Sequence, residues 1–245
     1  MTGRTIVVTG GGTGIGRAVA ASFAADGDTV VITGRRREVL DDAVASLGSA
    51  GVRAVDFDAS DPAAVTAALD TLPPTVDVLV NAAGGNTGFD LPTPAPGDLA
   101  ALAALWGANF EANVLTAVLV TTGLLPRMPS GGRVITIGSI AARQGAGDYG
   151  AAKAAVETWT ASLAAEVGPR GITANVVAPG LTAGTEFFRG RLTEARRQRL
   201  VDATMTKREG TTDDVTAAVR YLASSGAGHV TGQVLHVNGG AYLGR

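Results

Sequence analysis

Two residues whose side chains could move a proton lie four positions apart, Tyr149 and Lys153. On a helix this spacing places both side chains on one face. A tyrosine has a pKa of about 10 and is a poor acid or base at neutral pH, but a nearby ammonium group favours its phenolate. Ser139 follows a predicted strand, so its hydroxyl could point into the same space. These three residues predict a site for acid–base chemistry.

A glycine-rich loop near the N-terminus predicts a nucleotide site. The sequence from Thr9 to Gly16 is TGGGTGIG, between a predicted strand and a predicted helix. Gly10 would allow a tight turn, Gly14 would let the backbone approach a pyrophosphate, and Gly16 would permit close packing of the helix. The helix N-terminus offers free N–H groups to phosphates. Arg17 and Ala18 follow Gly16, where a P-loop would have Lys and then Ser or Thr, so a P-loop is not favoured. A glycine-rich turn without a ligand is the alternative.

The end of the second predicted strand bears on the choice of dinucleotide. Enzymes that use NAD usually place an acidic residue there, to accept a hydrogen bond from the ribose 2′-OH. This chain has Gly34 followed by Arg35 and Arg36. A guanidinium group suits a 2′-phosphate, so we expect NADP(H), with Arg35 as the main contact. The alternative is a solvated start to the next helix.

The elements that would position these residues alternate along the chain. Short apolar runs predict strands at 5–9, 29–33, 54–57, 77–81, 133–137, 173–177 and 234–237. Helices are predicted at 14–26, 38–47, 62–72, 98–125, 149–167 and 212–224, with Asp61 and Thr211 as N-caps. Strands that are apolar throughout are typical of a sheet covered on both faces. We therefore predict an α/β fold, a Rossmann-like doubly wound parallel seven-stranded sheet with helices on both faces.

One segment interrupts the alternation. No strand is predicted from Pro179 to Arg208, and the segment is rich in arginine. We expect residues 1–245 to form a single domain with a substrate-covering insertion at about 180–208, at the carboxyl edge of the sheet. The basic stretch 189–199 could steer an acidic substrate such as a carrier-bound acyl thioester, or form the solvated face of a covering helix.

Composition excludes several classes of function. The 245 residues carry a net charge of −2, which does not favour nucleic acid. The chain has no cysteine, and neither His229 nor His236 has a partner at metal-ligand spacing, so no metal site is expected. No apolar run approaches the ~20 residues of a membrane span, and residues 5–9 are interpreted as a strand and not a signal peptide. We expect a cytoplasmic protein without a membrane partner.

These motifs together resemble the single-domain branch of the short-chain dehydrogenase/reductase family, over nearly the whole chain. The resemblance is carried by the glycine loop, by the sequence NAAG at 81–84, by Ser139, Tyr149 and Lys153, and by Trp106 with Asn113 in the fourth helix. Pro179-Gly180 and the segments 231–233 and 237–240 also match. Within the family, the chain is similar to the 3-oxoacyl-[acyl-carrier-protein] reductases. The loop between Ser139 and Tyr149 is a few residues shorter than is usual there.

The resemblance implies roles for individual residues. Tyr149 would donate the proton to the carbonyl oxygen, Ser139 would hydrogen-bond that oxygen, Lys153 would bind the nicotinamide ribose, and Asn113 would hold a water that links Lys153 to solvent. These four are the expected catalytic residues. The expected cofactor-binding residues are Thr9, Gly10, Gly12, Thr13, Gly14, Ile15, Gly16, Arg35, Arg36, Asp58, Ala59, Asn81, Ala82, Ala83, Gly84, Tyr149, Lys153, Pro179, Gly180, Thr182 and Thr185.

The expected activity is reversible hydride transfer between NADP(H) and a ketone or secondary alcohol. The resemblance favours a 3-oxoacyl thioester or a related ketone as substrate, and a homotetramer or homodimer as the assembly. The alternative is a regulator on the same fold that binds NADP(H) without catalysis and senses redox state. Such a protein would not need Tyr149 and Lys153, and this chain has both.

Overall fold

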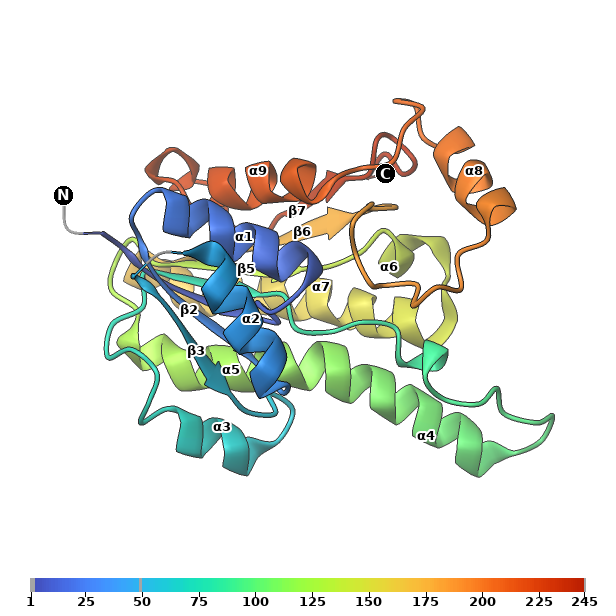
Figure 1. Ribbon diagram of the computed structural model, residues 1–245, viewed down its shortest axis with the longest axis horizontal. Coiled ribbons are helices and arrows are strands. Elements are labelled where there is room, and N and C mark those ends of the chain that lie inside the picture. The colour runs from blue at the N-terminus through green and yellow to red at the C-terminus, as the bar shows by residue number, and fades with distance from the viewer. Residues whose placement is uncertain (1–2, 49, 245) are drawn as a thin grey trace.

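A single parallel sheet organises the molecule (Figure 1). The computed structural model describes residues 3–48 and 50–244. The seven strands are β1 (Thr5–Thr9), β2 (Thr29–Gly34), β3 (Val52–Asp56), β4 (Val78–Asn81), β5 (Arg133–Ile137), β6 (Thr173–Pro179) and β7 (Val234–Val237). Their order across the sheet is β3-β2-β1-β4-β5-β6-β7, and every neighbouring pair is parallel. The predicted doubly wound sheet is confirmed.

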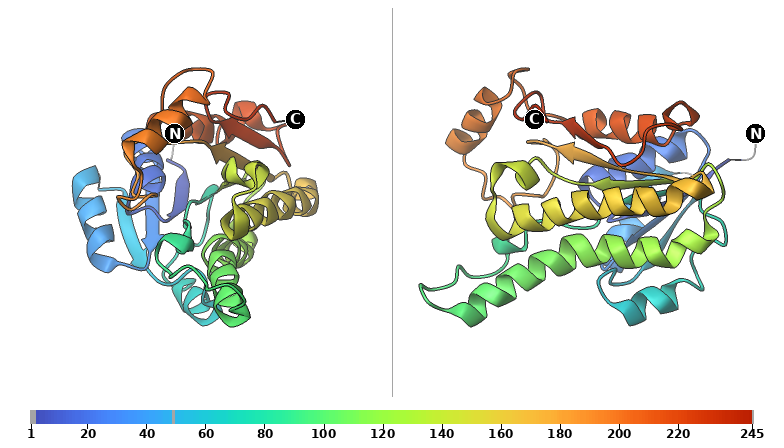
Figure 2. Two further views of the ribbon diagram at one scale, coloured as in Figure 1. Left: turned by 90° about the vertical axis from the view of Figure 1, so that its right-hand side faces the viewer. Right: turned by 180° about the vertical axis from the view of Figure 1, so that it is seen from behind.

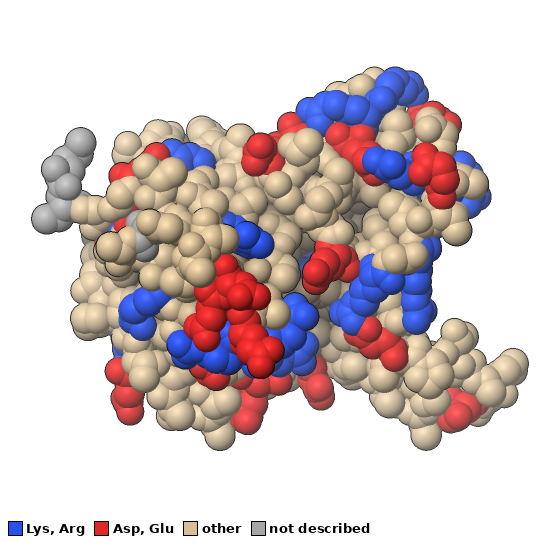
Figure 3. Space-filling view, in the orientation of Figure 1, with Lys and Arg blue, Asp and Glu red and all other residues tan. Residues whose placement is uncertain are grey.

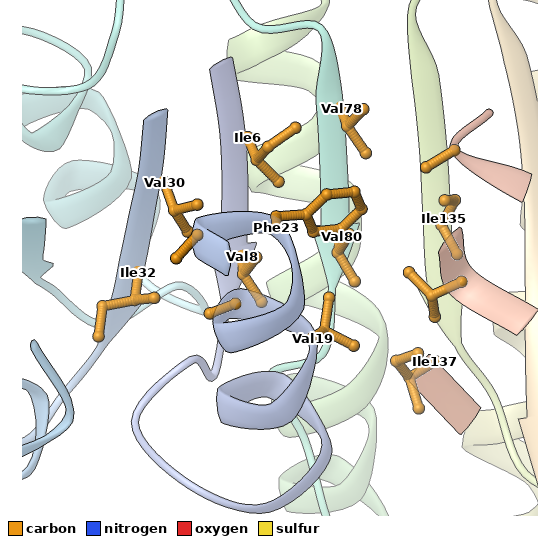
Figure 4. Packing of buried hydrophobic residues seen from close by; sticks show 14 of the residues in the cluster. Ile6, Val8, Val19, Phe23, Val30, Ile32, Val78, Val80, Ile135 and Ile137 are labelled. Carbon is orange, nitrogen blue, oxygen red and sulfur yellow. The ribbon is translucent and has the colours of Figure 1, made fainter. Parts of the chain in front are cut away.

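The strands are apolar throughout because both of their faces are buried. In β1, Ile6 and Val8 belong to one hydrophobic cluster, and Val7, between them, belongs to another on the opposite face. Figure 4 shows Ile6 and Val8 packed with Phe23 of the first helix. Alternate residues of one strand thus stabilise two separate layers of helix.

Helices cover both faces of the sheet (Figure 2). One hydrophobic cluster receives side chains from α1 (Gly14–Ala25), α2 (Arg37–Leu47) and α9 (Thr212–Leu222). The other receives them from α3 (Pro62–Ala68), α5 (Thr116–Leu124) and α7 (Gly147–Val167). The remaining helices are α4 (Leu99–Phe110), α6 (Ala141–Gln144) and α8 (Glu194–Asp202).

The predicted caps are present at two helix starts. Asp61 accepts a hydrogen bond from the Ala63 N–H at 2.9 Å, with Pro62 as the first residue of α3. Thr211 and Asp214 form a reciprocal capping box at α9: the Thr211 hydroxyl accepts from the Asp214 N–H, and the Asp214 carboxylate accepts from the Thr211 N–H. Both caps satisfy N–H groups that have no partner within the helix.

Several predicted elements differ in the structure. The helix expected at 62–72 ends at Ala68. The strand expected at 54–57 lies at Val52–Asp56, because its ladder with β2 begins where Val52 pairs with Val30. The helix expected at 98–125 is divided into α4 and α5 by a π-helical turn, Glu111–Leu115. This turn carries Asn113, whose side chain bonds away from the helix. π-turns of this kind occur frequently at functional sites.

The helical run Leu99–Arg127 is long and apolar enough to cross a membrane by length and composition alone. The sequence-based expectation that no segment reaches this length was therefore wrong. The run contains two buried asparagines, Asn109 and Asn113, and α4 contacts α7. These are the properties of a helix that packs on a globular body.

The insertion predicted at 180–208 follows β6. It leaves the carboxyl end of the strand, crosses this edge of the sheet and forms α8, at the upper right of Figure 1. The short helix α6 lies at the same edge, between Ser139 and Tyr149. All the parts that were predicted to bind a ligand therefore reach one edge of the sheet.

Candidate active site

The glycine loop joins β1 to α1 and packs closely against the loop after β4. Gly10 has a φ of +65°, and a Cβ built on it would lie 2.8 Å from the Ala82 carbonyl oxygen. Any larger residue would push the two loops apart. Thr13 makes no side-chain cap at the start of α1, so its hydroxyl does not compete for the first N–H groups of this helix. An anionic group fits such a helix N-terminus.

Neighbouring residues hold this loop in place. A Cβ on Gly16 would lie 2.3 Å from the Gly10 carbonyl oxygen, so the first turn of α1 lies directly on the loop. A Cβ on Gly12 would lie 3.1 Å from the Val39 side chain of α2, and Ile15 packs against the hydrophobic cluster. Gly14 is different, because the atoms nearest to its Cβ position belong to Thr185 of the insertion.

Polar side chains connect β1 with the segment after β4. The Thr9 hydroxyl accepts hydrogen bonds from the N–H groups of Ala82 and Ala83, at 3.1 and 3.0 Å. Asn81 is 3% exposed, and its amide donates to the Thr121 hydroxyl at 2.8 Å. Thr9 and Asn81 were predicted to contact the cofactor, and in the structure their side chains bind other parts of the chain.

Asn113 fixes the next part of the same segment. Its amide donates to the carbonyl oxygens of Gly85 and Asn109, both at 2.9 Å, and its oxygen accepts from the Gly85 N–H at 3.1 Å. Gly84, at φ +143°, passes so close that an added Cβ would lie 2.6 Å from the Asn113 oxygen. Both donor hydrogens of the amide are committed to backbone carbonyl oxygens, so the side chain positions the loop.

Tyr149, Lys153 and Ser139 are brought together by α7 and the end of β5. Tyr149 and Lys153 lie in the first half of α7, and each is 6% exposed. The Lys153 ammonium donates to the Ile137 carbonyl oxygen at 2.9 Å and lies 5.9 Å from the Tyr149 ring centre. The Ser139 hydroxyl accepts from the Ala141 N–H at 3.1 Å, which fixes its direction.

Burial dominates the electrostatics of this group. It raises the pKa of Tyr149 to about 12, although a hydrogen bond with Ser139 lowers it. Burial also lowers the pKa of Lys153 to about 8. Each shift arises because the charged form loses water. The direction for Tyr149 is opposite to the one expected from its lysine, and the phenol is a neutral proton donor at pH 7.

Arg35, Arg36 and Asp58 lie at the carboxyl ends of β2 and β3. Neither Arg35 nor Arg36 makes a side-chain hydrogen bond or ion pair among residues 3–48 and 50–244, whereas Arg37 pairs with Asp41 and Asp56. The pKa of Asp58 is lowered by a hydrogen bond from Ser60, opposed by burial and assisted by the charge of Arg35. The two free guanidinium groups can therefore receive a phosphate.

The other predicted contacts are distributed around this edge. The Pro179 carbonyl oxygen accepts from the Ile140 N–H, and the Gly180 N–H donates to Val237. A Cβ on Gly180 would lie 2.8 Å from the Asn238 side chain. The Thr182 hydroxyl donates to the Gly180 carbonyl oxygen at 3.2 Å. Ala59 is 7% exposed and its side chain packs in the hydrophobic core.

Several residues near Tyr149 were not predicted. Asn109 is fully buried, and it accepts from the Thr87 N–H and donates to the Asp148 carboxylate. Phe89 and Phe187 contact each other, and Phe187 contacts the Tyr149 ring. No spacing signal could have found these pairs, because each joins segments that are distant in the sequence.

A glycine loop beside a serine–tyrosine–lysine group, at the carboxyl edge of a doubly wound sheet, defines a nicotinamide-dependent oxidoreductase. Residues 2–242 match a family model described as enoyl-(acyl carrier protein) reductase. The chain is 34% identical to 3-oxoacyl-[acyl-carrier-protein] reductase FabG of Escherichia coli, with 98% of each protein covered. It therefore belongs to the short-chain dehydrogenase/reductase family and is an oxidoreductase.

Solved structures agree with this family. A short-chain dehydrogenase/reductase from Brucella melitensis, described as a glucose/ribitol dehydrogenase, superimposes with a TM-score of 0.84 at 32% identity, covering 98% of this chain and 97% of that one. A blue fluorescent protein from a metagenomic library, in complex with NADPH, gives a TM-score of 0.84 at 32% identity, with 99% of each chain covered.

Proposed function

We propose that this protein interconverts a ketone and a secondary alcohol with NADP(H). The observation that carries the proposal is the placement of Ser139, Tyr149 and Lys153 at the edge of the sheet where the glycine loop lies. NADP(H), when bound, supplies or accepts the hydride. The residues of this chain bind the dinucleotide and handle the proton.

Tyr149 is the proton donor in reduction. Its raised pKa keeps the phenol protonated at neutral pH, and the Ser139 hydroxyl is close enough to it to lower that pKa in part, so the two hydroxyl groups lie near one another. A carbonyl oxygen can accept a hydrogen bond from each of them, and these bonds strengthen as negative charge develops on that oxygen. Lys153 lies on the same side of α7, where its ammonium can bind a ribose hydroxyl and favour departure of the proton from Tyr149.

NADP(H) is proposed over NAD(H) because of Arg35 and Arg36. Both guanidinium groups are exposed and are without an ion-pair partner in the described part of the chain, at the end of β2. A 2′-phosphate would give them one. The NADPH bound to the metagenomic protein supports the same choice.

The names of the relatives supply the first substrates to test. The Escherichia coli relative is named for 3-oxoacyl carrier-protein thioesters, and the family model is described by enoyl thioesters. Paired hydroxyl groups suit a carbonyl oxygen better than a carbon–carbon double bond, so we propose a 3-oxoacyl thioester or a related ketone. Residues 180–208 would cover it. Basic and acidic side chains lie near one another in the region of α8 (Figure 3), and Arg197 pairs with Glu194 and Glu209, which favours a solvated helix face over an electrostatic guide.

A variant of Tyr149 tests the proposal. NADPH oxidation is followed by absorbance with a panel of 3-oxoacyl thioesters, enoyl thioesters and simple ketones. Tyr149→Phe should reduce kcat by at least about a hundredfold, because it removes the proton donor, and it should leave NADPH affinity within about twofold. Full turnover by Tyr149→Phe would refute the assignment of Tyr149 as proton donor. Tight NADPH binding by a wild-type protein that turns over no carbonyl compound would favour the alternative, a non-catalytic regulator that binds NADP(H).

A further inference from the structure

Three phenylalanines from two distant segments meet beside the proposed proton donor. Phe89 ends the short turn Thr87–Phe89, and Phe187 and Phe188 belong to the insertion after β6. The ring centre of Phe89 lies 5.8 Å from that of Phe187 and 6.1 Å from that of Phe188, and the latter two are 5.0 Å apart. The Phe89–Phe187 and Phe187–Phe188 pairs are edge-to-face. We call these residues the phenylalanine cluster.

The phenylalanine cluster borders the reacting group directly. The Phe187 ring centre lies 5.4 Å from that of Tyr149, at an interplanar angle of 53°. Tyr149 is buried, whereas all three phenylalanines are half-buried. Each of these residues therefore keeps part of its surface accessible, whereas residues whose only role is to fill a core are fully covered. Accessible aromatic surface at this place is available to a ligand.

Charged contacts hold the cluster together from outside. Asp90 directly follows Phe89, Arg189 directly follows Phe188, and these two residues form an ion pair. The Arg196 guanidinium of α8 lies 5.4 Å from the Phe188 ring centre. The two segments that carry the rings are thus connected both through the rings and through the ion pair.

We propose that the phenylalanine cluster determines substrate specificity, by selecting ketones that carry a flat apolar group on the carbonyl carbon. This inference rests on the proposed ketone reduction. Of the two substrate classes named there, it selects the other ketones over the 3-oxoacyl thioesters. Aryl or cyclic ketones present a ring that can stack on Phe187 or meet its face edge-on, a contact that can be worth up to about tenfold in affinity. A linear chain makes no such contact and loses more rotational freedom on binding. An acyl chain on a carrier would also have to pass between the connected segments.

A matched pair of ketones tests this selection. Acetophenone and octan-2-one are both eight-carbon methyl ketones, one with an aromatic ring and the other with a linear chain. We expect wild-type kcat/KM to be higher for acetophenone, and Phe187→Leu to reduce the ratio of the two values about tenfold, chiefly through the KM for acetophenone. Tyr221→Leu, on the exposed face of α9, makes the same kind of substitution away from the site and should leave the ratio unchanged.

The outcomes separate this inference from the proposed function. An unchanged ratio in Phe187→Leu, or a wild-type preference for octan-2-one or acetoacetyl-CoA, overturns the specificity assignment while ketone reduction itself stands. If the wild type reduces no ketone, the proposed function fails. Saturation-transfer NMR of acetophenone with the enzyme–NADP⁺ complex then tests separately whether the phenylalanine cluster binds an aromatic ring. Binding that is lost in Phe187→Leu supports the cluster as a binding surface, and binding that is equal in both proteins overturns it.

Discussion

At the scale of single residues, the main feature is a buried amine. Lys153 is 6% exposed, its carbonyl partner is neutral, and burial lowers its pKa to about 8 from an ordinary value of 10.5. The folded state therefore binds this proton less tightly than the unfolded chain does, and charged Lys153 destabilises the fold. The cost is fully present below pH 8 and declines as pH rises to about 10.5. A bound anionic dinucleotide reduces the same cost.

Lys153→Met is expected to stabilise the protein and inactivate it. Removal of the buried charge should raise the free energy of unfolding at pH 7 by about 1–3 kcal/mol. The gain should shrink as pH rises from 8 to 10.5, since the wild-type amine is then neutral in the folded state. Urea unfolding at several pH values measures the gain, and a variant less stable than the wild type at pH 7 would contradict the assigned charge penalty.

Arg35 allows a second test at this scale. Arg35→Ala should weaken NADPH binding about tenfold and change NADH binding by less than about twofold, because only NADPH has the 2′-phosphate. Arg37→Ala is the matched control, since that guanidinium is already paired with Asp41 and Asp56. Thermal-shift titration with each dinucleotide gives both affinities. Equal losses of NADPH and NADH affinity in Arg35→Ala would show that the side chain does not read the phosphate.

At the scale of elements, the π-helical turn Glu111–Leu115 explains how a loop and a helix are joined. The turn directs Asn113 toward the segment after β4, where its amide makes hydrogen bonds with both backbone groups of Gly85. Gly84 passes against the same amide without a side chain. The shape of this loop, which separates the glycine loop from Phe89, therefore depends on a local irregularity of a helix.

Gly84→Ala tests that dependence. The new methyl group would lie 2.6 Å from the Asn113 oxygen, so the substitution should destabilise the protein by about 1–3 kcal/mol and lower kcat/KM. Gly97→Ala is the control, because Gly97 also has a positive φ, +83°, but no atom lies within 4 Å of its Cβ position. Thermal unfolding of both variants separates the clash from backbone strain. Similar losses of stability in Gly84→Ala and Gly97→Ala would show that the contact with Asn113 does not determine the shape of this loop.

Local patterns predicted the elements well and their contacts less well. The strand at 5–9 and the caps Asp61 and Thr211 follow from residue types within a few positions, and the structure confirms them. The helix predicted at 98–125 was wrong in its middle, because hydrophobic periodicity does not register an asparagine that bonds to a distant loop. Likewise, Tyr149 and Lys153 were found from their spacing, but the contact of Phe187 with Tyr149 depends on folding of the insertion.

At the scale of the whole molecule, α4 exposes an apolar stripe. Leu99, Leu102, Trp106 and Phe110 follow one another at helical spacing and are 36–74% exposed. Figure 1 shows α4 extending beyond the sheet at the lower right. Large exposed apolar patches mark interaction surfaces, and this stripe fits the homodimer or homotetramer that the resemblance implies.

Leu102→Glu should disrupt this assembly. A carboxylate at the centre of the stripe would have to be buried in the interface, so light scattering after gel filtration should show a shift toward monomer. Tyr221→Glu introduces the same charge at an exposed aromatic residue of α9, on the opposite face of the sheet, and should leave the mass unchanged. A wild-type monomer, or an unchanged mass for Leu102→Glu, would disprove the interface.

The contact between Thr185 and the glycine loop has a kinetic consequence. Thr185 lies at Gly14, and only Glu186 separates it from Phe187, which lies at Tyr149. These three consecutive residues therefore link the glycine loop to the proposed proton donor. In the proposed function, a dinucleotide that binds at Gly14 would move segment 185–187, which would also border the ketone, so the pyridine nucleotide should bind first and leave last. Product inhibition should accordingly follow a compulsory order, with NADP⁺ competitive against NADPH and the alcohol competitive against neither substrate.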